Sequence, residues 1–153
     1  MRAATFAAFL MLAGFCAAQD AAPRRMTQEG LHAILAEVAQ GFRAEGPIAV
    51  VRLGDTQLLC ISDELADRMR IIAPVKRVEE ATPQELLAAL QANFHTVLDA
   101  RYAVSNGVIF AAYLHPLSPL TREQLLSAMQ QVAAARASFG TDYSSGGPVF
   151  GGR

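Results

Sequence analysis

Three segments of the chain repeat apolar residues at the spacing of one helical face, and each opens with a threonine that can cap a helix. Thr27 precedes the first segment, which stops at Gly46-Pro47. Thr82 and Thr121 precede the other two, and each is followed three residues later by the Glu or Gln of a capping box. The pattern therefore predicts three helices. Their apolar faces are formed by Leu31, Ile34, Leu35, Val38 and Phe42, by Leu87, Leu90, Phe94 and Val97, and by Leu125, Met129, Val132, Ala133 and Phe139.

Shorter runs between these helices have the apolar or alternating pattern of β-strands. Gly54-Asp55 and Asn106-Gly107 each separate two such runs, which is a hairpin signal. The five strands are predicted over residues 48–53, 56–61, 68–75, 101–105 and 108–114. Because hairpins join antiparallel strands, we predict an α+β fold. It has an antiparallel five-stranded sheet with three helices, in the order α-βββ-α-ββ-α.

The first eighteen residues have the pattern of a secretory signal. Met1-Arg2 supplies a positive start, residues 3–15 are uncharged and apolar, and the small residues Ala17 and Ala18 follow. We expect cleavage after Ala18 and a periplasmic or secreted product with no stable membrane span. An uncleaved anchor is the alternative, although the apolar run is shorter than the ~20 residues of a spanning helix. Lipid attachment at Cys16 is disfavoured because the preceding residue is the bulky Phe15.

The remaining chain is predicted to be one domain with short flexible ends. Residues 19–25 lack periodicity and are predicted to be a flexible leader. Residues 26–140 contain all the predicted helices and strands and form the domain. Residues 141–153, rich in glycine and serine, are predicted to be a flexible tail.

Composition and charge narrow the classes of function. The formal net charge is −1 and no basic stripe is present, so nothing favours binding of nucleic acid. Signal cleavage leaves Cys60 as the sole cysteine, in an apolar run where we expect a buried and inert thiol. His32, His95 and His115 lack the spacing of metal ligands, and no cofactor motif is present. We predict neither a metal nor a cofactor, and no catalytic residues.

One group of residues is a candidate binding strip. It consists of Arg68, Arg70, Arg101, Tyr102 and His115. Arginines can bind carboxylates or peptide carbonyls, and the ring of Tyr102 supplies rigid contact area. The alternative is that the arginines line a solvated sheet face, with Asp99 as a cross-strand partner.

The element order resembles that of the type III secretion chaperones, in the Tir-chaperone-like superfamily, which also contains the YbjN-like proteins. Four strings strengthen the likeness to YbjN-type proteins: RMRIIAPV at 68–75, LDARYAV at 98–104, HPLSPL at 115–120 and FGTDYSSG at 139–146. The likeness covers residues 26–140.

The resemblance implies a non-enzymatic module that binds a protein or peptide partner, with a homodimer as its expected assembly. Family members act in the cytoplasm, whereas this chain carries an export signal. Two alternatives stay open from the residues alone. One is a structural envelope component without a specific ligand. The other is a small hydrolase or lyase that uses His115 with Arg70 or Arg101 in one pocket.

Overall fold

A computed structural model describes residues 25–146. The three predicted helices are present as α1 (Gln28–Val38), α2 (Pro83–His95) and α3 (Arg122–Ser138). Each is capped by its predicted threonine: Thr27 accepts a hydrogen bond from the Gly30 N–H, and Thr82 and Thr121 form complete capping boxes. These caps satisfy backbone donors that a helix leaves unpaired, so they fix where the helices begin.

The strands form one antiparallel sheet. They are β1 (Gln40–Glu45), β2 (Ile48–Leu53), β3 (Thr56–Asp63), β4 (Arg68–Arg77), β5 (Arg101–Ser105) and β6 (Val108–His115), and a short 3-10 helix, η1 (Val78–Glu80), follows β4. Their order across the sheet is β1-β2-β3-β4-β6-β5. The predicted α+β class, the three helices and the antiparallel pairing are confirmed.

The predicted count of five strands is wrong, because β1 adds a sixth strand to the sheet. We placed Phe42 on the first helix, but α1 ends at Val38 and the chain becomes extended at Ala39. Gly41, at a φ of +64°, lies where the pairing of β1 with β2 is irregular. Of the six residues of β1 only Phe42 is partly buried, so no alternating apolar pattern marks this edge strand.

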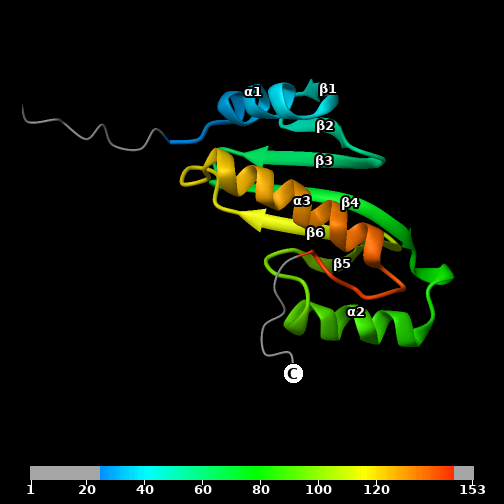
Figure 1. Cartoon of the computed structure of the whole chain (residues 1–153). Helices are drawn as coiled ribbons and strands as arrows, with labels where there is room; N and C mark the ends of the chain where they lie inside the picture. Colours follow the sequence, from blue (N-terminus) through cyan, green and yellow to red (C-terminus); the bar gives the residue numbers. More distant parts are fainter. Residues whose placement is uncertain (1–24, 147–153) are drawn as a thin grey trace, which may run out of the picture.

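The helices give the sheet one covered face (Figure 1). Helix α3 crosses the middle of the sheet and packs against β4 and β6, while α1 lies along β1 and β2 and α2 lies beside β5. Alternate strand residues point into this layer, so Val51, Leu58 and Ile71 are at most 1% exposed. From the helices, Leu31, Leu125 and Val132 complete the core.

The domain continues beyond the predicted boundary at residue 140. The Tyr143 ring packs edge-to-face against Phe139 and Tyr102, at centroid distances of 5.2 and 6.0 Å. The Ser145 hydroxyl accepts a hydrogen bond from the Leu98 N–H at 2.8 Å. Residues 141–146 are thus held against the end of α2 and against β5, which glycine content alone did not indicate.

The predicted signal, residues 19–24 of the leader and residues 147–153 of the tail lie outside the described residues. In the part of the chain that is described, no helix is both long and apolar enough to cross a membrane.

Candidate protein-binding surface

The sheet face opposite α3 carries an apolar centre, and we call this side the open face. Along β2, β3 and β4 its residues alternate with the buried positions and keep part of their surface exposed. Cross-strand pairing places Val50 opposite Leu59, Leu59 opposite Ile72, and Ile61 opposite Arg70. The apolar centre is formed by Ile48, Val50, Leu59, Ile61, Ile72 and Leu114.

Three residues of the candidate strip lie on the open face. Arg68 and Arg70 alternate with buried residues of β4 and point away from the core, as their spacing predicts. Arg101 pairs with Ala112, which pairs in turn with Ile72, so Arg101 lies on the same face. Its guanidinium donates to the backbone carbonyls of Leu98 and Ala100, at 2.5 and 2.6 Å.

The other two residues of the strip lie on the helix side. Tyr102 is 7% exposed, and its hydroxyl donates to the Ala135 carbonyl of α3 at 2.7 Å. Burial raises the pKa of this phenol. His115 pairs with the buried Met69 at the end of β6, and its ring stacks on Tyr113. The structure therefore separates His115 from Arg70 and Arg101, and the single pocket that the hydrolase alternative requires is not formed.

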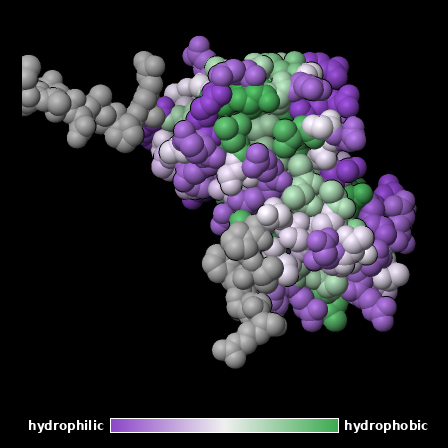
Figure 2. All heavy atoms as spheres, in the orientation of Figure 1, coloured by the Kyte–Doolittle hydropathy of each residue, from purple (hydrophilic) through white to green (hydrophobic). Residues whose placement is uncertain are grey.

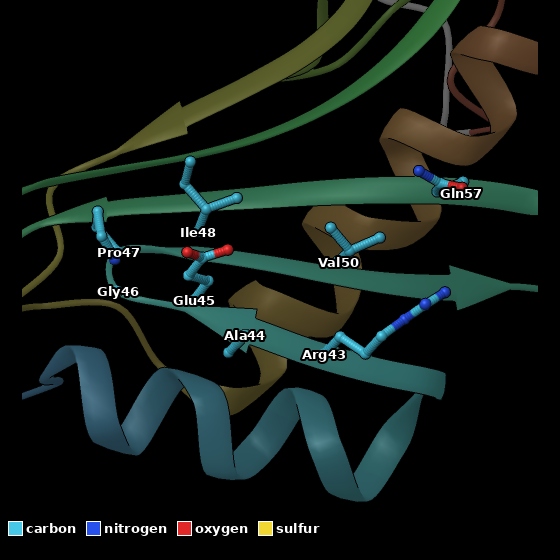
Figure 3. Close-up of a pocket in the computed structure, with 8 residues that line it drawn as sticks. All are labelled: Arg43, Ala44, Glu45, Gly46, Pro47, Ile48, Val50 and Gln57. Atoms are coloured by element: carbon cyan, nitrogen blue, oxygen red, sulfur yellow. The ribbon is translucent and has the colours of Figure 1, made fainter.

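A hollow of about 870 Å³ opens at the β1 end of the open face (Figure 3). Ile48 and Val50 of β2 project into it, away from α1, and Arg43 and Glu45 of β1 border it. The hairpin turn Gly46-Pro47 closes one end, with Gly46 at a φ of +54°. The hollow is thus an apolar floor beside a strand that has a neighbour on only one side.

The two edges of the sheet differ in accessibility. At the β5 edge the Asn93 side chain of α2 occupies the place of a neighbouring strand. It accepts from the Tyr102 N–H at 2.7 Å and donates to the Tyr102 carbonyl at 3.1 Å. Among the described residues, β1 pairs with β2 alone, so its outer backbone groups remain open to another chain.

Helix α2 presents to solvent most of the apolar face that we predicted for it. Leu87, Leu90 and Phe94 are 57, 65 and 81% exposed, whereas Ala89 and Ala92 face the core. The fourth residue of the predicted face, Val97, follows the end of α2 and is buried. Leu90 also lines a hollow of about 320 Å³ with Val104 of β5. Such clustered exposure is typical of a contact surface rather than of scattered surface residues. Figure 2 shows a second apolar area, between α1 and α3.

The pKa shifts of two side chains arise from burial and from local hydrogen bonds. Cys60 is buried, as predicted, and its burial raises the pKa of the thiol to about 12. Asp67 accepts hydrogen bonds from the N–H and hydroxyl of Ser118, which lower the pKa of its carboxyl. Within residues 25–146, no three His, Cys, Asp or Glu side chains are arranged to hold a metal ion.

Sequence reasoning missed two arginines of the open face, Arg43 and Arg52. Arg43 was missed because its segment was interpreted as part of a helix, whereas Arg43 lies on β1 and pairs with Val50 of β2. Arg52 alternates with the apolar residues of a strand that was correctly predicted, and this alternation was the available signal.

Comparison with solved structures identifies the fold. A chain of the HopA1–SchA chaperone–effector complex superposes with a TM-score of 0.57 at 14% identity, covering 71% of this chain and 88% of that one. A chain of the ExsC–ExsE complex gives 0.55 at 11% identity, covering 71 and 90%. The complex of the Yersinia pestis type III secretion chaperone SycH with a stable fragment of YscM2 gives 0.55 at 10% identity, covering 72 and 99%.

The chain has the fold of a type III secretion chaperone. This confirms the resemblance inferred from the order of elements. No protein-family model matches the sequence, and no curated protein matches it either. The finer likeness to YbjN-type proteins stays a prediction. All three similar structures are complexes, and two of them, those of SchA and SycH, are described as complexes of a chaperone with another protein.

Proposed function

We propose that this protein is an exported, non-enzymatic module that binds a segment of another protein. The observation that carries the proposal is the open edge of β1 beside an apolar hollow. The uncovered apolar residues of the sheet and of α2 support it, because a domain without partners rarely leaves such patches. The complexes formed by structures of the same fold support a protein partner as well.

The partner segment binds by adding a strand to the sheet. Glu45 and Ile48 flank the two-residue turn and form a hydrogen-bonded pair across the hairpin. Because the direction of the backbone hydrogen bonds alternates along a strand, the next residue, Ala44, directs its N–H and C=O to the free edge. An extended segment can pair with these groups while its alternate side chains contact Ile48 and Val50 in the hollow. At the β5 edge Asn93 blocks the equivalent mode.

Selection from a displayed library of random extended peptides tests the proposal. Purified protein is expected to enrich related sequences with alternating apolar residues. Ala44→Pro removes one edge N–H and should weaken their binding by roughly tenfold or more, because a lost backbone hydrogen bond and a steric block act together.

Ala44→Val keeps the N–H and is the matched control, expected to bind as the unchanged protein does. Circular dichroism verifies that both variants fold. The proposal fails if no sequence family is enriched, or if the proline variant binds the enriched peptides as well as the valine variant does.

We propose further that two copies associate through the exposed stripe of α2. Leu87, Leu90 and Phe94 follow one another at helical spacing and, with Val104, form an apolar surface at the β5 end of the sheet. Because β1 lies at the opposite end, this homodimer leaves both β1 edges free. Export of the protein to the periplasm or medium is part of the proposal and is supported by the signal-like first eighteen residues.

A further inference from the structure

The open face is rich in arginine and carries a positive net charge, although the chain as a whole is slightly negative. Six arginines and two acids of the strands project from it, a formal net charge of +4 on a chain whose total is −1. The arginines are Arg43, Arg52, Arg68, Arg70, Arg77 and Arg101, and the acids are Glu45 and Asp63. Among the ion pairs of the described residues, Arg77–Glu79 includes one of these arginines, whereas Lys76–Glu85 and Arg122–Glu37 lie elsewhere.

Three of these arginines are available to a ligand. Within residues 25–146 the guanidinium groups of Arg43, Arg52 and Arg70 have neither an ion pair nor a hydrogen bond. The acids of the same face, Glu45 and Asp63, do not form ion pairs with them. Arg68 and Arg101, in contrast, donate to nearby backbone carbonyls. Unpaired arginines beside apolar surface are the residues that proteins use to bind carboxylates.

The register arranges charge and apolar surface in one line. Arg43, Val50, Leu59, Ile72, Ala112 and Arg101 are successive cross-strand partners, one from each strand of the sheet. Five strand spacings of ~4.8 Å place the two arginines roughly 24 Å apart. Arg52 and Arg70 lie two residues from this line, on β2 and β4 and on opposite sides of it. An apolar track is thus bounded by positive charge at both ends and along both sides.

The form of the ligand follows from its backbone. A strand laid across the face of a sheet finds no partners for its N–H and C=O groups, whereas a helix satisfies its own. A helix about 16 residues long spans roughly 24 Å. Apolar residues on one side of such a helix can cover Val50, Leu59 and Ile72, while acidic residues at its ends and flanks approach the arginines.

We propose that the open face binds an acidic amphipathic helix of a partner protein, lying across the strands between Arg43 and Arg101. This rests on the proposed function, because it specifies the chemistry of a protein partner. It adds a second contact, separate from strand addition at β1. One partner chain can therefore be held twice, by an extended part at the edge and by a helical part on the face.

The same charge argues against two other occupants. A second copy packed face to face brings six arginines against six, so like charges oppose association. An anionic membrane suits protruding apolar side chains on a flat surface. Here Val50, Leu59, Ile61 and Ile72 are half-buried, whereas Ile48 and Leu114 are 43 and 59% exposed. The β1 end of the face is hollowed by about 870 Å³. A convex helix matches this shape.

Two fluorescein-labelled peptides of about 16 residues test the inference by fluorescence anisotropy. Both are amphipathic helices with the same leucine face, one flanked by glutamates and the other by lysines. The acidic peptide is expected to bind at least ~10-fold more tightly. R43E/R52E/R70E should lose that preference, whereas R25E/R122E/R136E, with the same change of net charge placed on residues outside the open face, should keep it. Circular dichroism confirms that both triple variants fold.

A photo-crosslinker at position 59 then locates the contact and should capture the acidic peptide, whereas one at position 87 on α2 should not. Ala44→Pro separates this inference from strand addition: it should leave binding of the acidic peptide unchanged even though extended peptides are lost. Equal binding of the two peptides overturns the inference, as does an R43E/R52E/R70E variant that binds normally. Capture at position 87 alone, or binding to phosphatidylglycerol vesicles with no binding of the acidic peptide, overturns it as well.

Discussion

At the scale of single residues, Asn93 determines which edge of the sheet is closed. Its amide makes both hydrogen bonds that a neighbouring strand would make to Tyr102. Because Tyr102 is buried, Asn93→Ala leaves a backbone donor and acceptor without these partners, and we expect a loss of about 1–3 kcal/mol in the free energy of unfolding. Urea denaturation measures this loss from the midpoint and slope.

Gln91→Ala is the control for that measurement. Gln91 is exposed on the same helix, so its replacement should change the free energy of unfolding by less than about 0.5 kcal/mol. If both alanine variants unfold at the same urea concentration, the hydrogen bonds of Asn93 to Tyr102 do not stabilise the domain, and the prediction is wrong.

The candidate strip shows what residue-level reasoning resolves and what it misses. The alternation of Arg68 and Arg70 with Met69 and Ile71 identified their exposed face correctly, because strand geometry alone determines it. We included Tyr102 in the strip because it follows Arg101 in the sequence. Adjacent residues of a strand point to opposite faces, however, so Tyr102 lies on the helix side. Nothing in the sequence indicates that the Tyr102 hydroxyl reaches Ala135, since that contact depends on how α3 crosses the sheet.

At the scale of elements, capping and turn residues were the most reliable signals. Both capping boxes and the Gly54-Asp55 and Asn106-Gly107 hairpins are present where predicted. β1 was missed because it is an exposed edge strand, and burial is what creates an alternating pattern. For α2, periodicity correctly found an apolar stripe but not its environment, because small residues on the other side of the helix pack closely on the domain.

The apolar stripe of α2 leads to a prediction about assembly. Leu90→Glu and Phe94→Glu together should convert a dimer to a monomer, because burying two carboxylates in an apolar contact without partners is strongly unfavourable. Sedimentation velocity across a range of protein concentrations measures this. A shift of tenfold or more in the dissociation constant is expected, which corresponds to about 1.4 kcal/mol.

Leu65→Glu provides the comparison for the α2 variant. Leu65 is fully exposed in the turn between β3 and β4, away from α2, so it matches the substitution without touching the stripe. Sedimentation of the unchanged protein as a monomer at all concentrations would contradict the proposed dimer. The proposed dimer is also contradicted if Leu65→Glu weakens self-association as much as Leu90→Glu with Phe94→Glu does.

At the scale of the whole molecule, the three proposed surfaces lie at different places around one sheet. The β1 edge lies at one end, the α2 stripe lies at the other, and the open face connects them. A dimer formed through α2 therefore presents two β1 edges and two open faces, far from its own contact. Two weak sites on one partner chain, or two partners on one dimer, gain affinity from being linked.

The location of the molecule determines which partners it meets, and the first eighteen residues predict export. When the full chain is expressed in a secreting bacterial host, the product outside the cytoplasm should begin at Gln19, as N-terminal sequencing and intact mass can establish. Leu10→Arg with Leu12→Arg interrupts the apolar run and should retain an uncleaved chain in the cytoplasm, whereas Leu10→Ile with Leu12→Ile preserves the run and should be exported normally. If the unsubstituted chain stays in the cytoplasm and begins at Met1, the proposed export is refuted.

Two other outcomes would change the proposed location. A membrane-bound chain that begins at Met1 would identify the apolar run as an anchor. A lipid-modified chain that begins at Cys16 would show lipid attachment in place of cleavage after Ala18. Either outcome would confine the β1 edge and the open face to partners near a membrane surface.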